Sequence, residues 1–363
     1  MCQFSDVNIR PMRDDERLIV RSMMRRAFSF IEQCYFEWTP NILVVERDGQ
    51  LLGAIVLKLF ALPHHRKGGT ISWLSTVPEA RGQGLGQYLV EAGLDFLERQ
   101  GCDEILISVE GFNTSSSKLF AMRGFGILSP GGQFRRYGLA TFAVWARLSH
   151  YFEWGYFLWT RPAPLEADSA ILQWWGTIAV NSAIALLMVW RMGDARVMEP
   201  MMWLALPLIF IILFGLRYLG MWLAAYRQGI QVRFRPWESG FPFSMAIALV
   251  FGAMYPIPGG VYPTTTQWRY RDWLPNLGWI TLAGTLPVLL LIGGVSILAP
   301  MDITPPYLEA WLNVTLWLGK PLILFDIAMP FFPFIAFNGR RLWDWNKIVW
   351  GVMAVATTIV WLF

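Results

Sequence analysis

The chain has 363 residues, of which 55% are hydrophobic and 15% charged, and its net charge is +4 at neutral pH. This composition is too apolar for one ordinary soluble domain and too charged for a protein embedded in lipid throughout. The basic residues lie mostly beside apolar segments, so nothing indicates a nucleic-acid-binding surface. We therefore expect a soluble domain over residues 1–150, a linker over 151–168 and an all-α membrane domain over 169–363.

The N-terminal domain is expected to stay in the cytoplasm. Charged residues interrupt positions 5–30, so no apolar core of a signal peptide is present there. All three histidines and all three cysteines lie within the first 150 residues. The membrane domain therefore offers neither imidazole nor thiolate to a metal ion, and we expect no metal site.

Periodicity predicts alternating strands and helices in the N-terminal domain. Two β-rich runs joined across Asp48-Gly49 are typical of a hairpin. A later strand leads into a glycine-rich segment, and the 3.6-residue period of residues 87–100 then predicts an amphipathic helix. The expected strands cover 7–10, 41–47, 51–60, 70–77 and 104–109, the expected helices 14–34, 87–100 and 114–123, and residues 134–146 are expected to supply a final strand or two.

The glycine-rich segment RGQGLG is the first candidate for a binding site. Glycines at 82, 84 and 86 let backbone N–H groups approach a ligand closely at the positive end of the following helix. Such a nest binds pyrophosphate. The same pattern is also compatible with a dinucleotide-binding loop or with a simple tight turn.

Two longer segments, STVPEARGQGLGQYLVEAGLDFL and NTSSSKLFAMRGF, resemble the signature segments of the GNAT acyltransferase superfamily. The resemblance covers roughly residues 5–148. It implies an α+β GNAT fold, in which helices flank a mixed sheet, and direct transfer of an acetyl group from acetyl-CoA to an amine of a small molecule or a protein. The pantetheine arm would run beside the strand over 72–77. The residues that the resemblance places at acetyl-CoA are Thr76, Arg81, Gly82, Gln83, Gly84, Leu85, Gly86 and Asn113.

The catalytic groups are less clearly marked. Phe120 stands where the family commonly has a tyrosine that protonates the departing thiolate, a task that water can also perform. The acceptor amine must lose a proton, and Glu79, Glu110 or the adjacent His64 and His65 are candidate bases. Each also has a structural interpretation: Glu79 as a solvated loop residue, Glu110 as an edge-strand charge, and the histidines as surface residues.

Six apolar segments follow, at 170–190, 201–226, 241–257, 277–298, 311–337 and 348–363. If all six crossed the membrane, the basic loop with Arg340, Arg341 and Lys347 would lie opposite the cytoplasmic N-terminus, against the positive-inside tendency. If the short segment 241–257 enters and returns, these residues become cytoplasmic. We therefore expect five spans plus one re-entrant segment in the plasma membrane of a prokaryote.

The membrane domain also resembles the site-2 metalloproteases over about residues 200–352. The resemblance rests on RYLGMWLAAYRQGIQVRFRPW, IPGGVYP and AMPFFPFIAFNGRRLWDWNKIVW. The family's two metal-binding histidines are replaced by Arg217 and Met221, its glutamate by Tyr218 and its aspartate by Asn338. A zinc peptidase needs those ligands and a carboxylate to activate water, so the resemblance implies a proteolytically inactive pseudoprotease.

Two ionisable residues, Lys320 and Asp326, lie inside the segment 311–337. A charge at membrane depth costs about 2.5–3.5 kcal/mol on insertion scales, so both are candidate functional residues. They pair with each other or line a cavity in one interpretation. In the other, Lys320 reaches the membrane surface beside Pro321, and Asp326 binds backbone groups freed near Pro330.

Two functions fit these features. The first is a membrane-tethered N-acetyltransferase whose pseudoprotease domain holds it at the bilayer. The second is a catalytically inactive acetyl-CoA sensor or adaptor, with the membrane domain binding a partner membrane protein. The intact glycine loop favours the first, and Phe120 together with the lost metal ligands favours the second.

Overall fold

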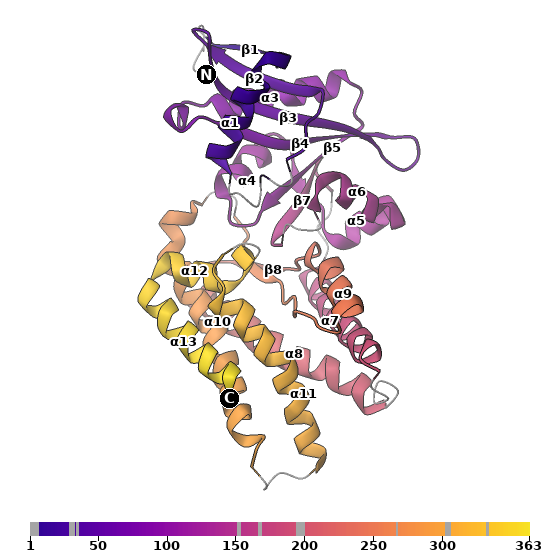
Figure 1. Ribbon diagram of the computed structural model, residues 1–363, viewed down its shortest axis with the longest axis vertical. Helices are drawn as coiled ribbons and strands as arrows, with labels where there is room; N and C mark the ends of the chain where they lie inside the picture. The colour runs from indigo at the N-terminus through magenta and orange to yellow at the C-terminus, as the bar shows by residue number, and fades with distance from the viewer. Residues whose placement is uncertain are drawn as a thin grey trace. The chain divides into compact units, whose positions relative to one another are not determined.

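The computed structural model describes residues 7–28, 33, 36–150, 154–165, 169–193, 200–265, 268–301, 306–331 and 334–363. The chain forms two compact units (Figure 1). The first unit consists of Met1–Val109, Leu119–Ser149 and Leu158–Ala167. The second unit consists of Glu110–Lys118, His150–Phe157 and Asp168–Phe363.

A seven-stranded sheet in the order β1-β2-β3-β4-β5-β7-β6 forms the framework of the N-terminal part. Its outer strands are antiparallel to their neighbours, whereas β4 and β5 are parallel. This mixed sheet, flanked by helices, confirms the predicted α+β fold. The strands are β1 (Asn8–Pro11), β2 (Asn41–Arg47), β3 (Gln50–Ala61), β4 (Lys67–Thr76), β5 (Glu104–Glu110), β6 (Gly126–Ile127) and β7 (Tyr156–Arg161), and the helices are α1 (Arg17–Ala27), α3 (Leu85–Arg99), α4 (Thr114–Ala121), α5 (Pro130–Tyr137) and α6 (Thr141–Leu148).

Local sequence signals place most of these elements. Asp48 and Gly49 both have positive φ, as a two-residue hairpin turn requires, and they join β2 to β3 as predicted. Helix α3 packs its apolar stripe, including Leu89, Val90 and Leu97, on the sheet. The first helix is shorter than expected: α1 ends at Ala27, and position 34 of the predicted helix lies outside the described residues.

The ladder between β4 and β5 is short. It pairs Gly68 with Glu104, Gly69 with Ile105 and Thr70 with Leu106, and no pairing is described beyond these residues. On its other side, β4 stays paired with β3 as far as Thr76. The backbone of β4 from Ile71 to Thr76 therefore has one edge that β5 does not cover.

The prediction of a final strand within residues 134–146 is wrong. Those residues belong to α5 and α6, which lie beside β7 (Figure 1). Ser129 caps α5 by accepting a hydrogen bond from the Gly132 N–H at 3.4 Å, and a proline follows it at the start of the helix. Val144 and Trp145 then bury one face of α6. The closing strand is β7, which lies within the segment expected to be a linker.

A buried carboxylate ties this helical pair to the sheet. The side chain of Glu104 is fully buried and accepts hydrogen bonds from Tyr137 at 2.8 Å and Thr160 at 2.6 Å. It also pairs with Arg66 at 3.3 Å and Arg136 at 3.1 Å. Such a carboxylate stabilises the fold only because its partners satisfy it.

We expect Glu104→Ala to destabilise the full chain by about 2–3 kcal/mol, since it leaves the hydroxyls and guanidinium groups around it without their acceptor. In detergent solution, its apparent melting temperature should fall by about 5 °C or more. The control is Asp14→Ala, which removes a carboxylate whose side chain is 92% exposed. Equal melting temperatures for the two variants would contradict this role of Glu104.

The second unit is mainly helical. Three of its helices, Ala170–Arg191, Trp203–Arg227 and Tyr270–Leu298, are long and apolar enough to cross a membrane. Two shorter apolar helices, Gly240–Phe251 and Lys347–Leu362, do not reach that length, so their part in the predicted topology stays a prediction. The elements are α7 (Ala170–Arg191), α8 (Pro200–Arg227), β8 (Val232–Arg235), α9 (Gly240–Phe251), β9 (Gly260–Pro263), α10 (Tyr270–Leu298), α11 (Pro306–Ile323), a π-helical turn (Leu324–Ala328), a 3-10 turn (Phe334–Ala336), α12 (Asn338–Trp345) and α13 (Lys347–Leu362).

The expected single span over 311–337 is not one helix. Helix α11 ends at Ile323, a π-helical turn follows over Leu324–Ala328, and a 3-10 turn covers Phe334–Ala336. Pro321 and Pro330 flank this break, and proline removes backbone donors that a continuous helix needs. The break brings Asp326 and Asn338 together within the unit.

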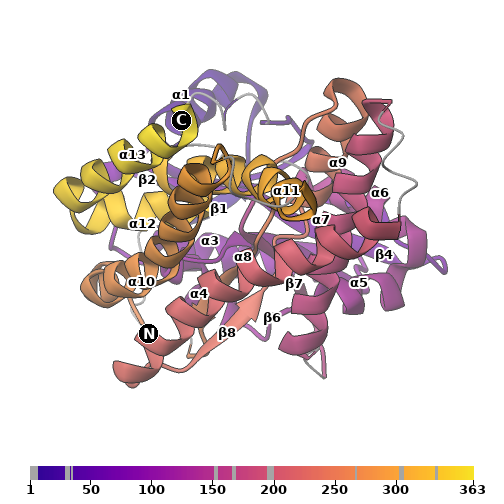
Figure 2. The same cartoon turned by 90° about the horizontal axis from the view of Figure 1, so that it is seen from below.

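Helices α8 and α10 pack closely against each other (Figure 2). A Cβ on Gly220 would lie 2.0 Å from the carbonyl oxygen of Ala283, and a Cβ on Gly284 would lie 2.4 Å from the Met221 side chain. Only glycine permits this approach. Small residues at helix crossings are typical of packed membrane helices.

The segment between β8 and β9 returns to its starting point. Arg235 and Gly260 are paired neighbours in the β8–β9 ladder, so the chain between them leaves and comes back at the same place. After α9 the backbone is irregular, and the Asn181 side chain provides hydrogen-bond partners for it. This side chain donates to the Ile257 carbonyl at 3.0 Å and accepts from the Ile257 N–H at 2.9 Å. Irregular backbone at membrane depth requires such protein partners.

Candidate functional site

The glycine loop lies between the end of β4 and the start of α3. Gly82 and Gly84 have φ of +78° and +82°, a conformation that other residues adopt only with strain. Gly84 is the N-cap of α3, so the first N–H groups of this helix lack partners within it. The loop therefore presents backbone donors at the positive end of a 15-residue helix.

The side chains around the loop leave these donors accessible. Arg81 and Gln83 are exposed, and the Gln83 side chain accepts a hydrogen bond from Arg47 at 3.1 Å. Leu85 is 1% exposed, so its side chain belongs to the core and only its backbone can contact a ligand. Gly86 has open space where a side chain would be, with Leu74 first met at 4.0 Å.

Thr76 ends β4 and is half-buried, and the short turn Pro78–Ala80 separates it from the loop. Its strand has the uncovered edge described above, from Ile71 to Thr76. Unpaired N–H and C=O groups along a strand edge accept an extended ligand that carries amide groups. The strand with the uncovered edge leads through Val77 and the turn Pro78–Ala80 into the glycine loop, and all of these residues belong to the first unit.

Of the candidate bases, Glu110 has the strongest electrostatic signature. It is the last residue of β5. Desolvation raises the pKa of its carboxyl to about 7. Two smaller effects lower that pKa: the Phe112 N–H donates a hydrogen bond to the carboxylate at 2.9 Å, and the positive charge of Arg341 attracts it. A base with a pKa near 7 is well matched to proton transfer at neutral pH.

The other candidates are placed differently. Glu79 is exposed in the short turn Pro78–Ala80, immediately before the glycine loop. His64 and His65 are exposed in the turn before β4. Because β4 runs from Lys67 to Thr76, about 30 Å of strand separates the two histidines from the loop. The histidines are therefore far from the glycine loop itself.

Asn113 and Phe120 lie at the two ends of α4. Asn113 is exposed, and its side-chain oxygen accepts from the Ser116 N–H at 3.1 Å, so it caps the helix. Phe120 is 6% exposed and packs edge-on against Phe125, with ring centroids 5.3 Å apart. A buried phenyl ring at this position supplies no proton donor.

Changing Gly84 to glutamate places a side chain at positive φ and a negative charge in the nest. We expect Gly84→Glu to weaken acetyl-CoA binding to the full-length chain by at least about 100-fold in calorimetric titration. The matched control is Gly101→Glu, which has φ of +74° and open space for a side chain, at the opposite end of α3. If both variants bind acetyl-CoA like the parent, the loop is not the phosphate site.

The second unit contains a buried ion pair where the metal-ligand positions were expected. Arg217 on α8 donates to both carboxylate oxygens of Asp326, at 2.8 and 3.0 Å, and both residues are 3% exposed. A third nitrogen of Arg217 donates to the Gly259 carbonyl at 2.9 Å. The planar guanidinium thus binds a carboxylate bidentately and satisfies irregular backbone as well.

Two of the other residues at expected metal-ligand positions, Asn338 and Met221, lie beside this ion pair. The Asn338 side chain donates to Asp326 at 3.0 Å and lies 3.9 Å from the sulfur of Met221, and the Asn338 N–H also donates to Asp326 at 3.2 Å. Tyr218 instead faces Phe234, with ring centroids 5.9 Å apart. The proposed pairing of Asp326 with Lys320 is wrong, because its partner is Arg217. Lys320 is half-buried on α11 and has no ion-pair partner among the described residues.

Removing one member of this pair leaves the other charge buried without a partner. We expect Arg217→Met and Asp326→Leu each to destabilise the protein by about 3–5 kcal/mol. The double variant should recover most of that loss, and melting temperatures in detergent would measure the coupling. The matched control is the more exposed pair Arg340–Asp344, 2.9 Å apart, whose removal should cost less than about 1 kcal/mol. Additive losses at Arg217 and Asp326 would contradict this account.

Comparisons with known proteins agree with both parts of this description. Residues 12–125 match the sequence model of the acetyltransferase (GNAT) family. A mycothiol acetyltransferase of Renibacterium salmoninarum is 32% identical over 98 residues, which are 27% of this chain and 29% of that protein. N-alpha-acetyltransferase 30 of Saccharomyces cerevisiae is 33% identical over 87 residues, 24% of this chain and 45% of that protein.

The chain is also similar to a candidate zinc metalloprotease of Methanocaldococcus jannaschii. The two are 29% identical over 133 residues, which are 36% of this chain and 64% of that protein. In each of these three relatives the matched segment spans less than two thirds of the relative's own length. The chain is therefore similar to two kinds of protein, acetyltransferases and a metalloprotease.

Proposed function

We propose that the protein is a membrane-anchored N-acetyltransferase that moves acetyl from acetyl-CoA to an amine, because residues 12–125 match the acetyltransferase (GNAT) family model. The observation that carries this proposal is the uncovered edge of β4 leading into the glycine loop. The loop donors suit a pyrophosphate, and the edge suits the amide groups of a pantetheine arm. Acetyl-CoA supplies an activated thioester when it binds.

The residues of the chain can complete the transfer without a metal ion. The acceptor amine attacks the thioester carbonyl, a carbon–nitrogen bond forms and the carbon–sulfur bond breaks. The Glu110 carboxylate takes the amine proton, directly or through one water molecule. Phe120 cannot donate a proton, so water protonates the departing thiolate. The backbone of Thr76 and the Arg81–Gly86 loop orients the acetyl donor, and Asn113 holds the first turn of α4.

The second unit is proposed to anchor this domain in the bilayer of a prokaryotic plasma membrane, with the acetyltransferase on the cytoplasmic side. Three long apolar helices support this proposal. The paired ends of the segment between Arg235 and Gly260 support a re-entrant assignment for α9. Under that topology, the basic residues Arg340, Arg341 and Lys347 lie on the cytoplasmic side.

We further propose that the second unit has no protease activity. Arg217 occupies a position that a site-2 metalloprotease needs for histidine, and its guanidinium holds Asp326. Among the described residues, no three His, Cys, Asp or Glu side chains lie close enough together to hold a metal ion. A fixed positive charge at this place opposes the binding of a metal cation.

The alternative function is an acetyl-CoA sensor or adaptor that binds without transfer and passes the signal to a membrane-protein partner. Phe120 favours it, because a family proton donor is missing. Turnover separates the two functions. Purified full-length protein should release free CoA in a manner that depends on an added amine, tested with peptides, polyamines and aminoglycosides. Saturable acetyl-CoA binding without release for any amine in the panel would favour the sensor.

The pH dependence of the acetyl-transfer rate should also follow the ionisation of Glu110. If its carboxylate is the base, kcat/KM should rise with pH through about 7 and level off above it, since only the ionised form accepts a proton. Glu110→Gln should lower kcat/KM by about 100- to 10,000-fold and remove this limb of the profile. Glu79→Gln is the control and should keep both the rate and the profile. A wild-type profile in Glu110→Gln would exclude Glu110 as the base.

A further inference from the structure

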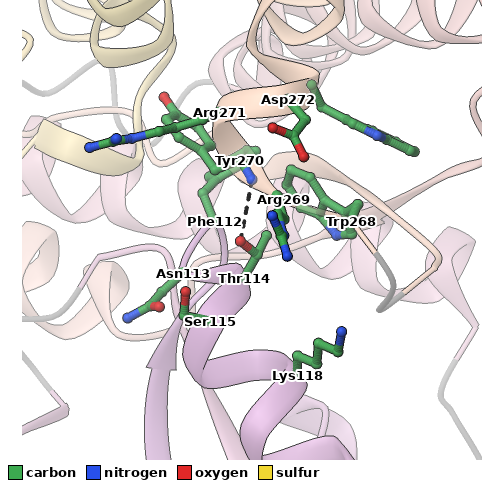
Figure 3. A pocket seen from close by; sticks show the side chains of 11 residues that line it. Phe112, Asn113, Thr114, Ser115, Lys118, Trp268, Arg269, Tyr270, Arg271 and Asp272 are labelled. Atoms are coloured by element: carbon green, nitrogen blue, oxygen red, sulfur yellow. Dashed lines mark hydrogen bonds between the residues drawn. The ribbon is translucent and has the colours of Figure 1, made fainter. Parts of the chain in front are cut away.

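A cavity of about 800 Å³ lies in the second unit, between the first turn of α4 and the start of α10 (Figure 3). Its lining combines hydroxyl and amide side chains at Asn113, Thr114 and Ser115 with aromatic rings at Trp268 and Trp273. The two helices are joined at its edge, where the Tyr270 N–H donates to the Thr114 hydroxyl at 3.3 Å. The volume suits a polar group larger than a single ion.

The charge of this cavity is predominantly positive. Lys118, Arg269 and Arg271 line it, against the single carboxylate of Asp272. The side chains of Lys118, Arg269 and Asp272 point toward the same space from two elements (Figure 3). All four residues are exposed, and none of the three cations has an ion-pair partner among the described residues.

Backbone geometry adds to this positive field. The cavity lies at the N-terminal ends of both α4 and α10, where the helix dipoles favour an anion. Arginine and lysine together with hydroxyl groups are the side chains that bind phosphate. A phosphate-bearing ligand is therefore the chemistry that the cavity fits.

The position of the cavity along α10 indicates where the phosphate comes from. Helix α10 is one of the three helices long and apolar enough to cross a membrane, and its first turn carries Arg271 and Asp272 before the apolar stretch begins. Trp268 and Trp273 flank that turn, with ring centroids 5.4 Å apart. Tryptophan and basic residues at the end of a span are typical of the level of the lipid headgroups.

We propose that this cavity binds the phosphate of an anionic lipid headgroup, with Lys118 and Arg269 as its main ligands. The proposal rests on the membrane anchoring proposed above. It gives the bilayer a direct contact with α4, the helix whose first turn Asn113 caps. A lipid held there would connect membrane composition to the acetyltransferase domain.

Native mass spectrometry of the full-length protein tests the proposal. The protein is purified in neutral detergent and titrated with short-chain phosphatidylglycerol, and in a separate arm with inorganic phosphate. We expect the parent to retain one anionic lipid, and Lys118→Ala/Arg269→Ala to bind it at least about tenfold more weakly. The control Arg227→Ala/Lys347→Ala removes the same charge from other helix ends of the unit and should bind like the parent.

Equal lipid retention by the parent and by Lys118→Ala/Arg269→Ala would overturn the proposal. So would displacement of the lipid by inorganic phosphate at equal concentration, because the site would then be one for soluble phosphate. Acetyl-CoA titration and release from membranes by alkaline carbonate are measured on the same variants. A variant that loses only lipid binding can therefore be told apart from a protein that does not bind acetyl-CoA or is not anchored in the membrane.

Discussion

The proposed acetyl-CoA site depends on one constraint in the sheet, the early end of the ladder between β4 and β5. Beyond Thr70 and Leu106 the two strands no longer pair, yet β4 continues to Thr76. Backbone groups on that edge need partners, and a ligand with amide groups can supply them. The same strand delivers the chain to the glycine loop, so the edge and the loop donors are fixed relative to each other. Under the proposed function, the end of β4 and the loop that follows it would together bind an extended, phosphate-bearing acyl donor.

In the second unit, the Arg217–Asp326 ion pair holds several elements together. It joins α8 to the π-helical turn, and through the Gly259 carbonyl it also holds the irregular segment that returns to β9. At the positions that resemble the metal-ligand positions of a site-2 metalloprotease, the structure therefore has a buried ion pair.

Local signals made much of the N-terminal fold predictable. The turn at Asp48-Gly49, the glycine loop before α3 and the capping residue Asn113 each act within a few residues. The segment 134–146 was misassigned because its aromatic and β-branched residues outweighed the short capping signal of Ser129-Pro130. Strand β7 was assigned to a linker because Pro162 and Pro164 follow it directly. In both cases tertiary packing, and not local preference, decided the structure.

Long-range interactions explain what the sequence could not predict in the candidate sites. The loop residues 81–86 were located by pattern alone, whereas the raised pKa of Glu110 depends on its burial in the folded chain, which the distant Arg341 opposes. The partner of Asp326 lies 109 residues away, on another helix. One clue was available: a buried arginine in an apolar helix requires a carboxylate, and Asp326 was the acidic residue inside the predicted spans.

Hydrogen–deuterium exchange of the full-length protein with and without acetyl-CoA tests the proposed acetyl-CoA site. We expect bound acetyl-CoA to slow exchange in two places: the amides of residues 82–86 and the uncovered edge of β4 over 71–76. The β2–β3 hairpin, whose strands pair from Asn41–Leu57 to Arg47–Gln50, should be unchanged. Saturating acetyl-CoA that leaves exchange at both places unaltered would contradict the proposed site and, with it, the proposed acetyltransferase.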